Sequence, residues 1–107
     1  MNTLLIANAP LPQRARLDAC IAECDIIICA DGGANRLLAV GIVPDVVVGD
    51  LDSFDRADHP AVADVEVVHR PDQNETDLQK TIEYALDQGA KKLVCLGISG
   101  GRLDHQL

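Results

Sequence analysis

Short apolar runs alternate with amphipathic stretches along the whole chain. Five runs rich in Val, Ile, Leu, Ala and Cys have the length of a strand, which is typical of strands buried on both faces of a parallel sheet. We expect these strands at residues 3–8, 25–30, 46–48, 65–69 and 93–96. Stretches with helical spacing lie between most of them, at about 11–23, 34–40 and 77–88, while residues 55–63 predict a loop or a weak helix.

The stretch 77–88 carries the clearest helix signals. Thr76 and Gln79 have capping-box spacing at its start, and Gly89 is a natural C-terminal stop. Its apolar positions predict one buried stripe, made of Leu78, Ile82, Ala85 and Leu86. Lys80 is then expected on the opposite side of the helix from the core.

The alternation of strands and helices predicts an α/β fold. The sheet should be mostly parallel with helices on both faces, which is a three-layer α/β/α, Rossmann-like arrangement. Residues 102–107, "RLDHQL", predict the start of one more helix. Because the sheet would need further elements to cover it, we expect residues 1–107 to be a single, partial domain that is incomplete at the C-terminus.

Composition narrows the class of partner. The 107 residues are 48% hydrophobic and 24% charged, which is typical of one soluble domain. A formal net charge of −8 disfavours nucleic acid and anionic membranes, because like charges repel. The four cysteines form no C-x-x-C pair, which indicates reduced thiols and a cytoplasmic location. The apolar start has no Lys or Arg before Arg14 and favours a first strand over a signal peptide.

Acids and glycines follow four of the predicted strands. In an open parallel sheet, ligands bind outside the carboxyl ends of the strands. The polar residues at those positions are Asp31, Gly32 and Gly33; Gly49, Asp50, Asp52 and Ser53; Asp72, Gln73, Asn74, Thr76 and Asp77; and Gly97, Ser99, Gly100, Gly101, Arg102 and Asp104.

Such an edge suits a metal-bound phosphate. Mg²⁺ takes carboxylate oxygens together with substrate phosphate, and glycines let backbone N–H groups approach phosphate oxygens closely. Lys80 and Arg102 are the candidate cations.

Each residue also has a purely structural interpretation. Asp50 and Asp52 could form a polar turn, Asp31 could cap the next helix, and Asp77 could be a first-turn acid favoured by the helix dipole. Lys80 could be a surface partner of Asp77, and the glycines of "GISGG" could form a plain turn. The residues are weak evidence singly and stronger together.

Four blocks of the sequence resemble, in order and spacing, the catalytic domain of thiamine pyrophosphokinase. They are "ADGGANRL" (30–37), "PDVVVGDLDS" (44–53), "DQNETDLQK" (72–80) and "GGRLDHQL" (100–107). The resemblance implies transfer of a pyrophosphoryl group from ATP to the hydroxyl of thiamine, which gives thiamine diphosphate and AMP and requires Mg²⁺.

The resemblance also implies roles for individual residues. Asp50, Asp52 and Asp77 would be metal ligands and, with Lys80, the catalytic residues. Asp77 and Asp50 are both candidates for the general base. The ATP or thiamine site would include Asp31, Gly32, Gly33, Ser53, Gln73, Thr76, Lys80, Gly100, Gly101, Arg102 and Asp104.

Members of this family add a C-terminal β-sandwich domain that contributes to the thiamine pocket and to a homodimer, and we expect that domain to be absent here. Two alternatives therefore stay open. One is a related pyrophosphokinase for another alcohol such as a hydroxymethylpterin, and the other is a Mg²⁺-nucleotide-binding fragment without activity.

Overall fold

The computed structural model describes residues 2–7, 10–49, 65–69, 77–98 and 101–106. The elements within these ranges follow one another as β1 (Asn2–Ile6), α1 (Arg14–Glu23), β2 (Ile26–Ala30), α2 (Asp31–Ala39), β3 (Val46–Gly49), β4 (Glu66–His69), α3 (Asp77–Asp87), β5 (Lys92–Ile98) and β6 (Gly101–Gln106).

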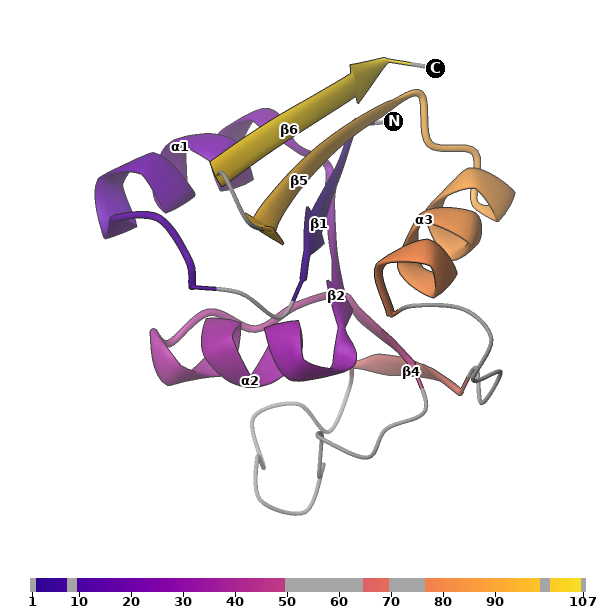
Figure 1. Ribbon diagram of the computed structural model, residues 1–107, viewed down its shortest axis with the longest axis horizontal. Helices are drawn as coiled ribbons and strands as arrows, with labels where there is room; N and C mark the ends of the chain where they lie inside the picture. The colour runs from indigo at the N-terminus through magenta and orange to yellow at the C-terminus, as the bar shows by residue number, and fades with distance from the viewer. Residues whose placement is uncertain (1, 8–9, 50–64, 70–76, 99–100, 107) are drawn as a thin grey trace.

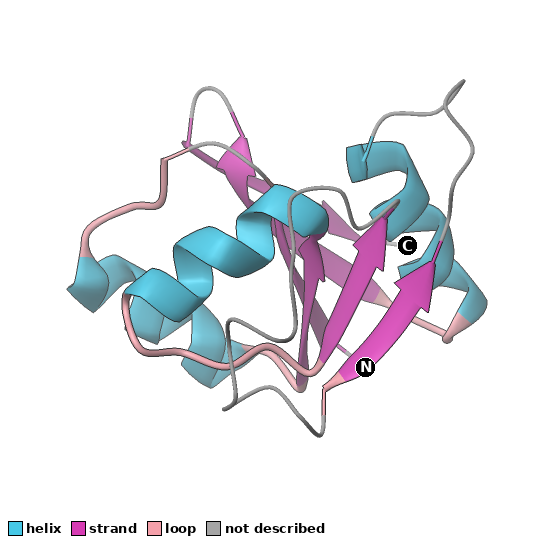
Figure 2. Ribbon diagram, turned by 90° about the horizontal axis from the view of Figure 1, so that it is seen from below, coloured by secondary structure: helices cyan, strands magenta, loops and turns pink. Residues whose placement is uncertain are grey.

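The strands form one sheet in the order β4-β3-β2-β1-β5-β6. Strands β1 to β5 are parallel, and β6 pairs antiparallel with β5 at the end of the sheet. Helices α1 and α2 cover one face and α3 covers the other (Figure 1), and the view from below shows the same three layers (Figure 2). The predicted α/β class, with a mostly parallel sheet between helices, is confirmed.

Alternation along the strands builds a separate core on each face. On β1, Leu4 and Ile6 pack with the α1 and α2 residues Leu17 and Leu37. Leu5 points to the other face and packs in the cluster that contains Tyr84 and Ala85 of α3. Successive side chains of a strand point to opposite faces, so a run that is apolar throughout fills both cores.

Residues 101–106 form strand β6, so the helix predicted at "RLDHQL" is wrong. The pairs Lys92–Gln106, Leu93–His105 and Cys95–Leu103 place β6 along the outer edge of β5. The outer edge of β5 offers a row of backbone donors and acceptors to this segment. Backbone pairing therefore decides the structure of this segment.

Helix α3 buries a face that matches the predicted apolar stripe only in part, since Ala85 is buried and Ile82 packs against the core but Leu86 does not. Leu86 is 45% exposed, while Lys80, Thr81, Tyr84 and Ala85 are all buried. The buried face is thus rotated by roughly one residue position from the predicted stripe, which at 3.6 residues per turn moves Lys80 from solvent into the protein. The predicted end of the helix is confirmed: Gly89 has a φ of 85°, and the Ala90 N–H donates to the carbonyl oxygen of Ala85 at 3.1 Å.

Two aspartates bind backbone at the edge where the parallel strands begin, which we call the amino edge. The Asn2 N–H donates to Oδ2 of Asp25 at 2.8 Å, and the Asp25 N–H donates to the Asn2 carbonyl at 2.8 Å. In the same way, the Ile27 N–H donates to Oδ2 of Asp45 at 2.8 Å, and the Asp45 N–H donates to the Ile27 carbonyl at 2.9 Å. We call each reciprocal pair an aspartate clasp. Each clasp fixes the register between two neighbouring strands.

Candidate functional site

The parallel strands all end at the opposite edge of the sheet, the carboxyl edge. Their last residues are Ile6, Ala30, Gly49, His69 and Ile98. The strand pairings align these ends, since Cys29 pairs with both Ile6 and Val47, and Gly49 pairs with His69. The topology therefore places the ends of β2, β3, β4 and β5 along one edge of the sheet.

Helix α2 begins at this edge, directly after β2. Its N-cap is Ala30, with φ −67° and ψ 159°, and Asp31 is the first helical residue. Asp31 is therefore not the N-cap, and the prediction of a glycine turn at residues 31–33 followed by a helix from 34 is wrong in its boundary. All three residues belong to the first turn of the helix, where backbone N–H groups lack partners within the helix.

Gly33 is a glycine because the end of β1 leaves no room for a side chain. A Cβ at this position would lie 2.9 Å from the Ala7 carbonyl oxygen and even closer to that of Ile6. No ordinary Cβ contact is that short, so the first turn of α2 can approach β1 only with glycine here. This contact sets the position of the α2 N-terminus at the carboxyl edge.

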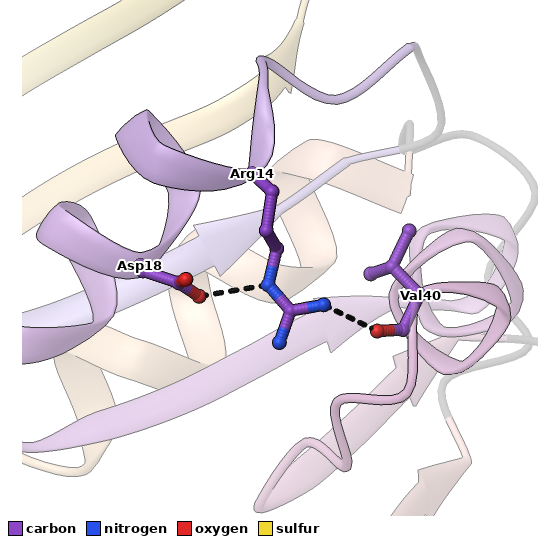
Figure 3. Close-up of polar contacts among 3 residues, drawn as sticks. All are labelled: Arg14, Asp18 and Val40. Atoms are coloured by element: carbon purple, nitrogen blue, oxygen red, sulfur yellow. Dashed lines mark hydrogen bonds and ion pairs between the residues drawn. The ribbon is translucent and has the colours of Figure 1, made fainter.

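Arg14 holds the other end of α2. Its Nη1 donates to the carbonyl oxygen of Val40 at 2.7 Å, and its Nε lies 2.9 Å from Oδ1 of Asp18 (Figure 3). Val40 is the residue that follows α2, and its carbonyl is at the negative end of the helix dipole. A cation on α1 thus joins the two helices of one face.

Lys80 lies in the first turns of α3 and is only 2% exposed. The structure therefore contradicts its interpretation as a surface partner of Asp77. Within the described ranges, no carboxylate forms an ion pair with its ammonium group. A lysine is almost never buried without a partner unless the protein has a use for the charge, because desolvation of an ammonium ion costs free energy.

The residues of β6 lie at different distances from the carboxyl edge. Gly101 pairs with Ile98, the last residue of β5, and Arg102 follows it. Asp104 pairs with Val94, in the middle of β5. The fold therefore brings Gly101 and Arg102 to the predicted site but sets the backbone of Asp104 farther from it than the predicted helix would have done.

Several predicted site residues lie outside the described residues, and their predictions stay untested: Asp50, Asp52, Ser53, Gln73, Thr76 and Gly100. For Asp31 and Asp77 the structure describes the backbone position alone. In the part of the chain that is described, no group of three or more His, Cys, Asp or Glu residues could hold a metal ion. The proposed Mg²⁺ ligands therefore come from sequence and topology.

The described chain also has a groove and four cysteines, and neither set of residues includes a predicted site residue. A shallow groove of about 320 Å³ is lined by Pro10, Leu11, Pro12, Arg36, Ala39 and Val40, and no predicted site residue lines it. None of the four cysteines, all of which the structure describes, forms a disulfide bond. Burial, and next the charge of Asp45, raise the pKa of the Cys29 thiol far above its ordinary value, which keeps it protonated and unreactive.

None of the helices described is both long enough and apolar enough to cross a membrane.

Sequence reasoning missed the aspartate clasps of the amino edge. Asp25 and Asp45 each stand directly before an apolar run, in "DIIICA" and "DVVVGD". That position was the available signal, because an acid that precedes a buried strand can accept from the backbone of the neighbouring strand. These two residues are structural, and they lie at the end of the sheet away from the candidate site.

Comparison with known proteins gives consistent matches. The family model described as thiamin pyrophosphokinase, catalytic domain, matches residues 17–107. Thiamine pyrophosphokinase of Bacillus subtilis (strain 168) is 30% identical over 111 residues, which cover 100% of this chain and 52% of that protein. Thiamin pyrophosphokinase 1 of Caenorhabditis elegans is 32% identical over 89 residues, which cover 75% of this chain and 36% of that protein.

The fold agrees with these matches. The crystal structure of thiamine pyrophosphokinase from Bacillus subtilis superposes with a TM-score of 0.71 at 26% sequence identity, covering 95% of this chain and 49% of that one. The chain spans about half the length, or less, of the curated relatives it matches. Because the family model covers most of its residues, the chain belongs to the thiamin pyrophosphokinase catalytic-domain family.

Proposed function

We propose that the protein transfers the pyrophosphoryl group of ATP to the hydroxyl oxygen of thiamine, giving thiamine diphosphate and AMP. The observation that carries this proposal is the family match over residues 17–107. The carboxyl edge supports it, because β2, β3, β4 and β5, which precede the acidic and glycine-rich blocks in the sequence, all end there.

The carboxylates suit a magnesium ion. Asp50, Asp52 and Asp77 would hold it, because Mg²⁺ prefers one or two carboxylates combined with substrate phosphate oxygens. Bound Mg²⁺ would neutralise charge on the phosphates of ATP. Asp50 directly follows Gly49 at the end of β3, and Asp77 is the first residue of α3, so both belong to elements that start or end at one edge.

The remaining residues would bind and orient the substrates. The buried Lys80 would place its ammonium against phosphate oxygens, and Arg102 would add a second cation. The first-turn N–H groups of Asp31 and Gly32 face the edge from which α2 begins. The other members of the proposed site are Gly33, Ser53, Gln73, Thr76, Gly100, Gly101 and Asp104, of which Gly33 already has a structural reason to be glycine.

The reaction is an in-line displacement at the β-phosphorus of ATP. The thiamine oxygen forms a bond to this phosphorus, the bond to the bridging oxygen of the α-phosphate breaks, and AMP leaves with that oxygen. The proton of the hydroxyl passes to a carboxylate, either Asp77 or Asp50. Positioning and charge neutralisation supply most of the rate enhancement in such transfers.

The proposal includes the setting of the protein. We propose that residues 1–107 are the ATP-binding part of a larger enzyme whose thiamine pocket a C-terminal β-sandwich domain completes, and that the full protein is a cytoplasmic homodimer. A net charge of −8 supports the absence of nucleic-acid and membrane partners.

An assay of the nucleotide product tests this function. Purified protein is incubated with ATP, Mg²⁺ and thiamine, and the products are separated by anion-exchange chromatography. We expect AMP and thiamine diphosphate in equal amounts, and neither product when the acceptor is a thiamine analogue without the hydroxyl group.

Three outcomes would contradict the proposal. ADP in place of AMP would mean transfer of a single phosphoryl group. AMP formed with a hydroxymethylpterin but not with thiamine would assign a different acceptor. Binding of Mg²⁺ and ATP, measured by calorimetry, without any transfer would make the protein a nucleotide-binding module.

A further inference from the structure

Lys80 and Tyr84 lie one helical turn apart on the buried side of α3. Lys80 is 2% exposed and Tyr84 is 7% exposed. Residues four positions apart are neighbours on a helix surface, with about 5–6 Å between their Cβ atoms. Tyr84 is also the single tyrosine of the chain, and it places an aromatic ring one helical turn after the buried lysine.

The direction in which helical side chains lean places Lys80 and Tyr84 differently relative to the carboxyl edge. In an α-helix, long side chains lean toward the N-terminus and cover the preceding turn. Tyr84 therefore covers the turn that carries Lys80, and Lys80 leans toward the turn that begins at Asp77. Because α3 joins the end of β4 to the start of β5, its first turn is the one nearest the carboxyl edge. The lysine stem thus extends toward the candidate site with the ring behind it.

The ring itself has a rigid support. Tyr84 packs in the core cluster between α3 and the sheet, together with Ile28 of β2 and Val46 and Val48 of β3. A tyrosine side chain has two torsions, whereas the four-carbon stem of a lysine has many staggered conformers. A fixed ring beside a flexible stem restricts the stem to the conformers that point away from the ring.

We propose that Tyr84 is a positioning residue for Lys80: its ring forms the apolar wall that keeps the lysine stem buried and its ammonium directed toward the carboxyl edge. The role assigned to Lys80 rests on the proposed function, whereas the wall itself is a property of α3. Preorganised charge is worth more in catalysis than a charge that must be collected from solvent.

Two substitutions separate the ring from its hydroxyl group. Tyr84→Phe keeps the ring and should leave Lys80 in place, while Tyr84→Leu removes the wall. The matched control is Leu93, which belongs to the same core cluster but pairs with Thr3 near the amino edge. Leu93→Val and Leu93→Ala are both made, and the free energy of unfolding of each is measured in urea. The variant whose value equals that of Tyr84→Leu serves as the control.

The first readout needs no catalytic activity. The folded proteins are treated with a small acylating reagent, and the rate of modification at Lys80 is measured by mass spectrometry relative to the exposed Lys91. We expect Tyr84→Leu to raise the Lys80 rate by about tenfold or more, since a buried amine becomes accessible when its cover opens locally. Tyr84→Phe and the Leu93 control should stay within about twofold of the unsubstituted protein.

The second readout is the split between kcat and KM in the AMP assay. Misplacing a group that acts on the reacting phosphates lowers kcat, so Tyr84→Leu should lose about 10- to 100-fold in kcat with a smaller change in the KM for ATP. Tyr84→Phe should retain most of the kcat of the unsubstituted protein, and the Leu93 control should retain its kcat as well.

The outcomes distinguish the positioning role from the proposed function. If Tyr84→Leu behaves like the Leu93 control in the labelling experiment, the positioning role is wrong. If Tyr84→Phe loses as much as Tyr84→Leu, the hydroxyl group and not the ring carries the effect, and the wall is again wrong. The labelling rates could follow the expectation while neither the unsubstituted protein nor any variant forms AMP with thiamine. In that case the positioning role of Tyr84 is supported and the proposed function is wrong.

Discussion

The two edges of the sheet both carry aspartates, and they use them differently. At the amino edge, Asp25 and Asp45 precede a strand, and their carboxylates accept hydrogen bonds from the backbone of the neighbouring strand. At the carboxyl edge, Asp31 and Asp50 follow a strand, where loops and helix N-termini meet. The aspartates before the strands join neighbouring strands, while those after the strands belong to the proposed ligand site. The position of an acid relative to its strand is thus more informative than its abundance.

The largest expected difference between the two edges is in the rate of AMP formation after one carboxylate at each edge is replaced by an amide. Asp52→Asn keeps the size of the side chain but removes a proposed metal ligand, so we expect the rate of AMP formation to fall by about 1,000-fold. Its free energy of unfolding should change by less than about 0.5 kcal/mol. The matched control is Asp45→Asn, which should retain its rate. A near-normal rate in Asp52→Asn would remove this residue from the site.

Lys80→Met tests whether the buried charge serves activity and not stability. Methionine replaces the lysine stem with an uncharged chain of similar length. The rate of AMP formation should fall by about 100-fold, because the cation proposed to face the phosphates is lost. The free energy of unfolding should stay the same or rise by up to about 1 kcal/mol, since no charge is then desolvated.

Lys91→Met, on the exposed turn after α3, is the control and should change neither quantity. A clear loss of stability in Lys80→Met would mean that the ammonium group has a structural partner, and would weaken the assignment of Lys80 to the site.

Gly33→Ala tests the packing that places α2 at the carboxyl edge. The added methyl group would collide with the Ile6 and Ala7 carbonyls, so we expect the free energy of unfolding to fall by about 1–3 kcal/mol. Gly41→Ala is an informative comparison: no atom lies within 4 Å of its Cβ position, and its cost should come from a φ of 82° alone. Equal crystallographic positions of α2 in Gly33→Ala and the unsubstituted protein would contradict the close-packing explanation.

The smallest expected effect is the loss of one aspartate clasp. Asp45→Ala removes one backbone-accepting carboxylate that is exposed to solvent, so the free energy of unfolding should fall by about 1 kcal/mol. The rate of AMP formation should not change at saturating substrate. The free energy of unfolding is measured by urea denaturation monitored by circular dichroism. A loss of activity without a loss of stability would place Asp45 in the function of the protein.

Much of the fold was predictable because it depends on local pattern. The runs that form β2, β3 and β5 are apolar at nearly every position, and a strand buried on both faces requires that composition. The pairing of β1 with β5, which lie far apart in the sequence, has no such local signal. It depends on which backbone edges meet, and so does β6, where pairing with β5 overrides a sequence typical of a helix.

The candidate site was predictable in its location and less so in its details. Knowing where the strands end was enough to bring Asp31, Gly101 and Arg102 to one edge. The burial of Lys80 was not predictable from the apolar stripe of α3, because the sheet selects the helix face by shape. Thr81 and Ala85 are small and fully buried, which lets α3 approach the strands on that side.

The clasps also bear on the order in which the molecule assembles. One links residues 2 and 25, and the other links residues 27 and 45, so each closes a single strand-helix-strand unit of about 20 residues. Neither closure has to wait for the C-terminal half of the chain. We expect the N-terminal units to be protected first in pulsed hydrogen exchange, and to present the open sides of β1 and β3, along which β5 and β4 then pair.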